Sequence, residues 1–281
     1  MRLIGELEEQ EKLSRYILRS QESGGQSPSQ KGIYFDILSQ KAVFIKTASF
    51  QEFFNHQIFY KISKKSSVVI PQPLSFTQVD SHPAIVMEYF PRTINLIHVN
   101  VAIKVKVYLQ VLVFLHNLNP LVFPKKLPAY LQLLSLPYVF LKNIIHYPGH
   151  TFLFFRATTG ILRQGLGWIF LKSNHVCHGD INVTNILVQK DKVVLLDFAR
   201  CFISHKYYNL SQVLNSTWFH AGFHEKLNQA IIKIFSLNEH ERKILSTFVI
   251  YNLLQRLGAR YSNPSQEKFY LQRLEQVLDS I

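Results

Sequence analysis

The sequence predicts an α+β fold with two unequal lobes, and three features of the 281-residue chain point to it. The first third contains short apolar runs separated by turn residues, which is typical of strands in an antiparallel sheet. From about Asn95 onward, long apolar patterns with a period of 3.6 residues predict helices. Near residue 190, two short apolar runs predict a single late hairpin. We therefore expect a small N-terminal antiparallel-sheet lobe at residues 1–92 and a larger, mainly helical C-terminal lobe at 93–281.

The first lobe is expected to contain four strands and one helix. Residues 20–32 are rich in Ser, Gln and Gly, and they predict a flexible turn at Gly24-Gly25 after a first strand. Ser49 is a candidate N-cap of the helix that follows. The expected later elements are the strands Ile33–Leu38, Ala42–Ile45 and Ala84–Tyr89 and the helix Phe50–Ile62.

The second lobe is expected to be built on helices with one apolar face. The clearest patterns lie at Val105–Leu118, Glu241–Leu257 and Glu267–Leu278. Two further uncharged stretches, Val107–Phe123 and Leu127–Leu141, are shorter than the roughly 20 residues of a membrane span and are interrupted by polar residues and prolines. We interpret both as core helices.

Composition excludes several classes of protein. Hydrophobic residues make up 47% of the chain and charged residues 17%, which is within the globular range. The N-terminus lacks a secretory pattern, and Cys177 and Cys201 are too few for a disulfide framework. We expect a cytoplasmic protein, with association at the inner face of the membrane left open. The net charge of +13 suits any polyanionic partner.

The residues that indicate chemistry lie between positions 178 and 200. Asp180 precedes the first strand of the late hairpin, Asn185 enters that strand, and Asp197 leaves the second strand. The two ends of an antiparallel pair meet, so Asn185 and Asp197 are expected to lie together. Two carboxylates and a carboxamide suit Mg²⁺ shared with substrate phosphates. Taken singly, Asp180 could be a helix cap, Asn185 a turn residue, and Asp197 the partner of Arg200.

This segment resembles the catalytic and metal-binding loops of the protein-kinase-like superfamily, in the form found in aminoglycoside phosphotransferases and choline kinases of the phosphotransferase enzyme family. His178-Gly179-Asp180 matches the His-Gly-Asp of that family, and Asp197-Phe198 matches its Asp-Phe-Gly-like element. The resemblance implies that Asp180 is the catalytic base and that Asn185 and Asp197 bind Mg²⁺. It also implies that His178 helps to hold the loop.

The resemblance extends upstream to a predicted ATP site. It implies that Lys46 contacts the α- and β-phosphates and that backbone groups of Glu88 and Tyr89 receive the adenine. The family pairs this lysine with a glutamate on the next helix, where Gln57 is the best-aligned residue and Glu52 a weaker candidate.

Two other family elements are altered in this chain. The glycine loop at Ser23–Ser27 departs from the kinase spacing. Downstream, Asn209 stands where the family has an aspartate that anchors the catalytic loop.

The acceptor site is expected to be shaped by the helical segment at about residues 119–174. This segment is apolar and aromatic and has almost no carboxylates, which disfavours a cationic acceptor such as an aminoglycoside or choline. A neutral or anionic small molecule, sugar or glycolipid fits better. The cations that could receive it are Lys125, Lys126, Arg156, Arg163 and Lys172.

The run Leu195–Arg200 and the segment Asn209–Leu214 are also similar to lipopolysaccharide-core kinases, which leaves peripheral membrane contact open. Two other classes of protein stay open. A pseudokinase or scaffold is suggested by Gln57 and by the weak glycine loop, and a nucleic-acid-binding protein is suggested by charge alone.

Overall fold

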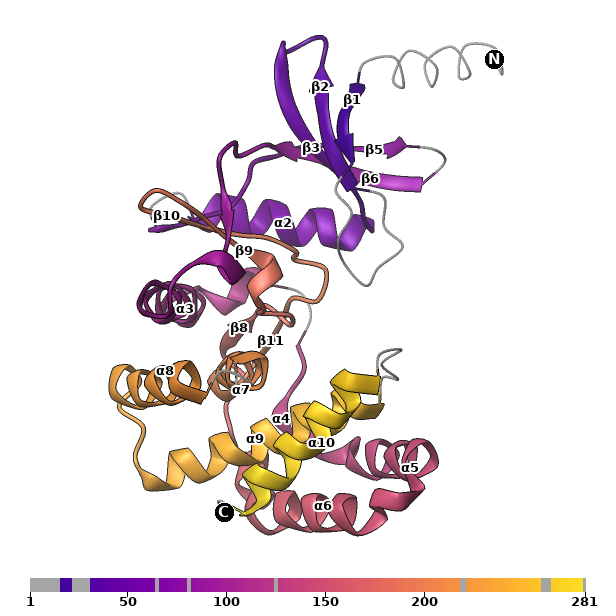
Figure 1. Ribbon diagram of the computed structural model, residues 1–281, viewed down its shortest axis with the longest axis vertical. Helices are drawn as coiled ribbons and strands as arrows, with labels where there is room; N and C mark the ends of the chain where they lie inside the picture. The colour runs from indigo at the N-terminus through magenta and orange to yellow at the C-terminus, as the bar shows by residue number, and fades with distance from the viewer. Residues whose placement is uncertain are drawn as a thin grey trace. The chain divides into compact units, whose positions relative to one another are not determined.

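A five-stranded antiparallel sheet in the order β1-β2-β3-β6-β5 forms the first part of the fold (Figure 1). Val43 and Ile45 of β3 and Ala84 and Val86 of β6 alternate onto one buried face, as the period of a strand requires. These strands are β1 Tyr16–Gln21, β2 Lys31–Asp36, β3 Lys41–Thr47, β5 Pro73–Val79 and β6 His82–Glu88. The prediction of an antiparallel N-terminal sheet is therefore confirmed.

A second sheet has the strand order β4-β10-β9-β7. The late hairpin supplies its two central strands, and β10 pairs in parallel with β4 through Val193 opposite Val68. Val193 and Val68 are both buried, so the hairpin is fixed by core contacts as well as by its turn. The strands are β4 Val68–Val69, β7 Ile94–Asn95, β9 Ile186–Gln189 and β10 Lys192–Leu195.

The computed structural model describes residues 16–21, 31–63, 66–79, 82–123, 126–217, 221–258 and 264–279. They divide into two units. The first unit contains the described residues up to Asn95 together with Leu187–Arg200, and the second contains Leu96–Ile186 and the described residues from Cys201 onward. The hairpin that we assigned to the C-terminal lobe thus lies in the first unit, because β9 and β10 complete the sheet of β4 and β7.

Helix α2, Phe50–Ser63, follows β3 as the sequence predicts. The Ser49 hydroxyl accepts a hydrogen bond from the Glu52 N–H at 3.2 Å, which confirms the predicted N-cap. Phe53 packs against Phe76 of β5 with ring centroids 5.5 Å apart, so the helix lies on the first sheet. The predicted glycine turn and glycine loop fall outside the described residues.

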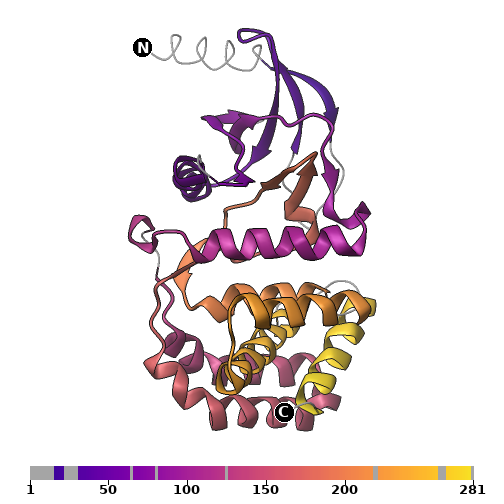
Figure 2. The ribbon, with the colours of Figure 1, turned by 90° about the vertical axis from the view of Figure 1, so that its left-hand side faces the viewer.

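The second unit is mainly helical, and α9 lies at its centre. Helix α9 packs against α5, α6, α7 and α10 and is buried on nearly all sides from Ile244 to Gly258. Helix α3 lies along α7 and α8 (Figure 2). The helices are α3 Val101–His116, α4 Ala129–Leu134, α5 Leu136–His146, α6 Thr151–Gly165, α7 Lys206–Thr217, α8 Ala221–Ile234, α9 Glu239–Gly258 and α10 Pro264–Asp279.

A short antiparallel pair that the sequence did not predict lies among these helices. Strand β8, His175–Cys177, pairs with β11, Phe202–Ser204. The pair joins the residues just before His178 to those just after Arg200. It therefore fixes both ends of the segment 178–200.

The stretch Leu127–Leu141 is not the single core helix that we expected. It forms α4 and the start of α5, which meet at Ser135, and its side chains Leu131, Leu134, Tyr138 and Leu141 are exposed. Burial is limited to one side of α5, at Leu136, Val139 and Asn143. Within the described ranges, no helix combines the length and apolar character needed to cross a bilayer.

Candidate active site

The first unit brings Lys46, Glu52 and Asp197 together. Lys46, near the end of β3, donates a hydrogen bond from Nζ to Glu52 Oε1 at 2.6 Å, and Nζ lies 3.1 Å from Asp197 Oδ1. Glu52 is in the first turn of α2, directly after β3, which places its carboxylate beside the strand end. Our assignment of Gln57 as the partner of Lys46 is therefore wrong, and the expected lysine–glutamate pair is present.

Burial and charge act in opposite directions on this cluster. Burial lowers the pKa of Lys46, but the carboxylates of Glu52 and Asp197 outweigh it, so the pKa lies above its ordinary value. Burial raises the pKa of Glu52, and the Lys46 ammonium opposes that shift. Lys46 is therefore a fixed positive charge at neutral pH, as a phosphate ligand requires.

Helix α2 also holds the residues that follow β10. Asp197 adopts a positive φ of 66°, and Phe198 next to it is fully buried against Phe59, with ring centroids 4.5 Å apart. Asn55 donates from Nδ2 to the Phe198 carbonyl at 2.9 Å. His56 packs against Phe198 and donates from Nε2 to the Pro71 carbonyl, and burial lowers its pKa to about 4.

These contacts fix the position of the Asp197 carboxylate. Sequence reasoning missed both Asn55 and His56. Their only signal was the occurrence of two polar residues on the buried side of a helix, at positions expected to be apolar.

The second unit carries the loop from His178 to Asn185. Gly179 adopts a φ of 84°, a conformation that glycine reaches without the steric cost of a side chain. The carboxylate of Asp180 accepts a hydrogen bond from Asn182 Nδ2 at 3.0 Å, and Asn185 Nδ2 donates to the Asp180 carbonyl at 2.9 Å. The short 3-10 helix Val183–Asn185 is capped by Asn182, whose Oδ1 accepts from the Thr184 N–H at 2.8 Å. Asp180 is therefore not the cap of this turn.

Side chains of α7 hold the loop in place. The His178 N–H donates to Asn209 Oδ1 at 3.1 Å, and Asn209 Nδ2 donates to the Val176 carbonyl at 2.8 Å. One helical turn further on, Gln212 donates to the Gly179 carbonyl at 2.7 Å. His178 is itself fully buried. Asn209 thus anchors the loop through two hydrogen bonds without carrying a charge.

Replacing Asn209 with alanine is expected to destabilise the protein by about 1–3 kcal/mol, because the buried His178 N–H and Val176 carbonyl lose their partner. Urea unfolding measures this loss. Asn174→Ala, at an exposed asparagine, is the control and should change stability by less than about 0.5 kcal/mol. Equal stability of the two variants would contradict the anchoring role.

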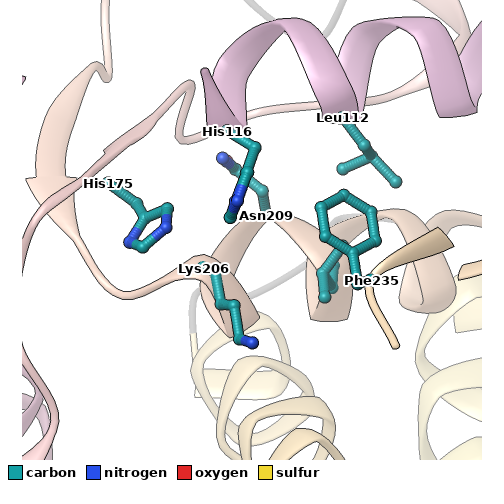
Figure 3. A pocket seen from close by; sticks show the side chains of 7 residues that line it. Leu112, His116, His175, Lys206, Asn209 and Phe235 are labelled. Carbon is teal, nitrogen blue, oxygen red and sulfur yellow. The ribbon is translucent and has the colours of Figure 1, made fainter. Parts of the chain in front are cut away.

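A small pocket lies beside Asn209, and Figure 3 shows the side chains around it. Its volume of about 10 Å³ leaves room for no more than a water molecule, so it is not a substrate site. His116 and His175 point into it with ring centroids 4.7 Å apart, and Lys206 lies beside them. Burial, together with His116 and Lys206, lowers the pKa of His175 to about 4.

This histidine cluster predicts a loss of stability in acid. Burial, His175 and Lys206 lower the pKa of His205 to about 3, and Glu241 only partly opposes them. Above pH 6.5 these histidines are neutral in both states and contribute no pH dependence. Between pH 6.5 and about 4 the unfolded chain binds protons that the folded protein does not, so the free energy of unfolding falls.

The measurement is urea unfolding at pH 7.5 and at pH 5. The variant His175→Gln, which cannot be protonated, should lose less stability between the two pH values than the wild type does. His240→Gln, at an exposed histidine, is the control and should keep the wild-type pH dependence. A wild-type pH dependence in His175→Gln would show that His175 does not stay neutral in the folded state.

The predicted hinge and acceptor residues are less closely organised. The Glu88 N–H donates to the Gln72 carbonyl at 2.9 Å, so an adenine would have to use other backbone groups of Glu88 and Tyr89. Arg156 is paired with Asp279 at 2.8 Å, whereas Arg163 and Lys172 are exposed. The backbone of Lys126 forms an isolated parallel β-bridge with Ile203, and Lys125 is outside the described residues.

The donor chemistry of the predicted metal ligands fits Mg²⁺. Asp197 presents a partly exposed carboxylate, and the carboxamide oxygen of Asn185 is not used in the bond that Nδ2 makes to Asp180. Within the part of the chain that the structure describes, no group of three or more His, Cys, Asp or Glu side chains could hold a metal ion. Two protein oxygens completed by phosphates are typical of Mg²⁺ shared with a nucleotide.

An antiparallel sheet with a lysine–glutamate pair, a helical unit and a His-Gly-Asp loop are the elements of a kinase-like fold. Residues 168–242 match the model of the phosphotransferase enzyme family (APH). This match covers the loop, the hairpin and α7, and it confirms the family resemblance predicted from the sequence. No match was found among curated proteins.

Solved structures agree with this fold along nearly the whole chain. A thermostable mutant of aminoglycoside phosphotransferase APH(4)-Ia, in a ternary complex with ADP and hygromycin B, is 12% identical and gives a TM-score of 0.74, with 96% of each chain covered. Choline kinase LicA from Streptococcus pneumoniae is 11% identical with a TM-score of 0.65 and 99% of each chain covered. Spectinomycin phosphotransferase APH(9)-Ia, in complex with ADP and spectinomycin, is 13% identical with a TM-score of 0.61, covering 96% of this chain and 95% of that one.

Proposed function

We propose that the protein transfers the γ-phosphoryl group of ATP to a hydroxyl group of a neutral or anionic small molecule, sugar or glycolipid. The observation that carries this proposal is the orientation of Asp180 by Asn182 and Asn185 in a loop anchored by Asn209. A carboxylate held in this way can orient an acceptor hydroxyl and accept its proton. The ADP bound in two of the similar structures supports ATP as the donor.

The charged cluster of the first unit is proposed to bind the nucleotide. Lys46 contacts the α- and β-phosphates as a positive charge, and Glu52 keeps its side chain extended toward them. Glu88 and Tyr89 receive the adenine through backbone groups. Gln57, which we first assigned to this site, has no role in the proposal, because Glu52 occupies the place of the family glutamate.

Asp197 and Asn185 are proposed to bind Mg²⁺ through a carboxylate and a carboxamide oxygen. The cation would neutralise phosphate charge during the transfer. Phe198, Asn55 and Gly179 hold the backbone on which these ligands stand. His178 is proposed to act through the loop and not on the substrate, because it is buried.

The lack of negative charge in the acceptor segment favours a neutral or anionic acceptor. No Asp or Glu occurs between Glu88 and Asp180, a range that includes the whole segment expected to shape the acceptor site. The similar proteins are named for, or bind, hygromycin B, spectinomycin and choline. These compounds carry amino or ammonium groups, which acidic side chains would bind. This chain offers the exposed Lys172 instead, which suits a phosphate or carboxylate on the acceptor.

The pseudokinase alternative loses its main support, because Glu52 supplies the ion pair that Gln57 did not. The decisive experiment incubates the protein with γ-labelled ATP, Mg²⁺ and a lysate divided into lipid, sugar and protein pools. Label in the sugar or lipid pool supports the proposal. If no pool is labelled and nucleotide does not bind, the protein is a scaffold. Binding to nucleic acid that weakens steeply as salt is added would instead favour a nucleic-acid-binding protein.

A further inference from the structure

Helix α5 presents an apolar face that the fold leaves uncovered. Counting from the end of α4, the spacing of four, three and four residues places its exposed side chains on one side of the helix. The buried residues Leu136, Val139 and Asn143 lie on the opposite side, and Asn143 donates to the Leu254 carbonyl of α9. The exposed side chains are Leu134 at the end of α4 and Tyr138, Leu141 and Ile145 of α5.

Helix α6 repeats the arrangement. Phe152, Phe155 and Leu162 are exposed on one side of this helix, whereas Phe154, Ala157 and Ile161 are buried on the other. Helices α5 and α6 pack against each other, and both pack against α9 (Figure 1). Their exposed sides therefore turn away from α9. We call these exposed side chains of α5 and α6 the α5–α6 face.

An exposed apolar surface of this kind in a globular protein marks an interaction site more often than it is accidental. Phe152 is 78% exposed and Tyr138 67%, so these rings gain almost nothing from the folded core. Aromatic and aliphatic side chains on the outer side of surface helices are typical of proteins that rest in the interface of a bilayer.

Charge identifies the partner of this face. Cations lie on the same two helices, since Arg163 of α6 is exposed and Lys142 Nζ of α5 lies 6.0 Å from the ring centroid of Tyr138. Among the described residues, no ion pair involves either of these two cations. Arg156, on the same side of α6, is already neutralised by Asp279. The segment between Glu88 and Asp180 contributes no negative charge at all.

We propose that the α5–α6 face docks on a membrane surface that contains anionic lipids, with the apolar side chains in the headgroup region and the cations on lipid phosphates. A second copy of this chain fits less well, because two basic faces would repel each other. The proposal does not depend on phosphotransferase activity, since binding to vesicles can be measured without any acceptor.

The test is flotation of the purified full chain with vesicles of phosphatidylcholine alone and with vesicles in which part of the lipid is phosphatidylglycerol. We expect binding to the anionic vesicles that weakens as salt is added. The double variant Phe152→Ser/Phe155→Ser should reduce the partition coefficient at least about tenfold, because two exposed rings no longer enter the lipid. Arg163→Gln should reduce it about fivefold and flatten the salt dependence.

The matched control is Leu38→Ser, which removes an equally exposed apolar side chain from the turn between β2 and β3 in the first unit. This control should bind vesicles as the wild type does. All variants change exposed residues, and their thermal unfolding should match the wild type.

Two kinds of result would overturn the proposal. One kind is a failure of the flotation test: either the wild type does not float with anionic vesicles, or the double variant floats as well as the wild type. The other is a wild-type oligomer in sedimentation analysis that the double variant converts to a monomer without any change in vesicle binding, which would assign the face to a second copy of the chain.

Discussion

Replacing Asp180 with asparagine is expected to reduce turnover by about 10²–10⁴-fold, the range of a positioned general base. Asparagine has the size of aspartate and can still accept one hydrogen bond from Asn182, so the loop should keep its conformation. The oxygen that is proposed to take the acceptor proton is lost. ATP affinity should stay within a few-fold of wild type, because Lys46 and Asp197 are unchanged.

The measurements are steady-state turnover on the acceptor found in the labelling experiment and nucleotide binding by calorimetry. Asp191→Asn is the matched control, since it makes the same change at an exposed residue in the turn between β9 and β10. It should leave both quantities unchanged. Wild-type turnover in Asp180→Asn would remove Asp180 from the mechanism, and loss of nucleotide binding would make it a metal ligand.

Replacing Asp197 with alanine is expected to abolish the stabilisation that Mg²⁺ adds to ATP binding. A ligand present at about a hundred times its Kd stabilises a folded protein by about 2.7 kcal/mol, so the wild type should show a clear rise of Tm. In the variant the carboxylate that is proposed to bind the cation is gone, and of its two carboxylate partners Lys46 keeps only Glu52. ATP should then give a similar, smaller rise of Tm with and without Mg²⁺.

Thermal unfolding with ATP, with and without Mg²⁺, measures this difference. Arg200→Ala changes an exposed residue three positions further along the chain and should retain most of the metal-dependent stabilisation. If the two variants behave alike, the assignment of Asp197 to the metal is wrong.

The fold was predictable from the sequence where a local pattern decides it. The strands β3 and β6, the cap at Ser49 and the hairpin of β9 and β10 depend on neighbouring residues, and all three were predicted. The burial of α5 was not, because an apolar composition does not show whether another element covers the helix. The chain has more apolar helix faces than the second unit buries.

In the candidate site, too, the sequence predicted the residues that a local pattern marks and missed those that depend on long-range contacts. The spacing of Asp180, Asn185 and Asp197 is a local signal, and it pointed to the loop and hairpin. The partner of Lys46 was misassigned to Gln57 because the pairing depends on where α2 begins after β3. Since Ser49 caps the helix, Glu52 lies in its first turn, beside Lys46. Asn55 and His56 contact Phe198, about 140 residues away in the sequence, and no local pattern contains such a contact.

The parallel pairing of β10 with β4 has a consequence for synthesis of the chain. Val68 must wait for Val193 before its sheet can close, so an emerging chain that ends before the hairpin exposes β4 and β7 as short unpaired strands. A fragment that stops after β7 lacks the two central strands of this sheet. The first unit is therefore contiguous in space but not along the chain, and its folding is tied to translation of the segment that carries Asp180.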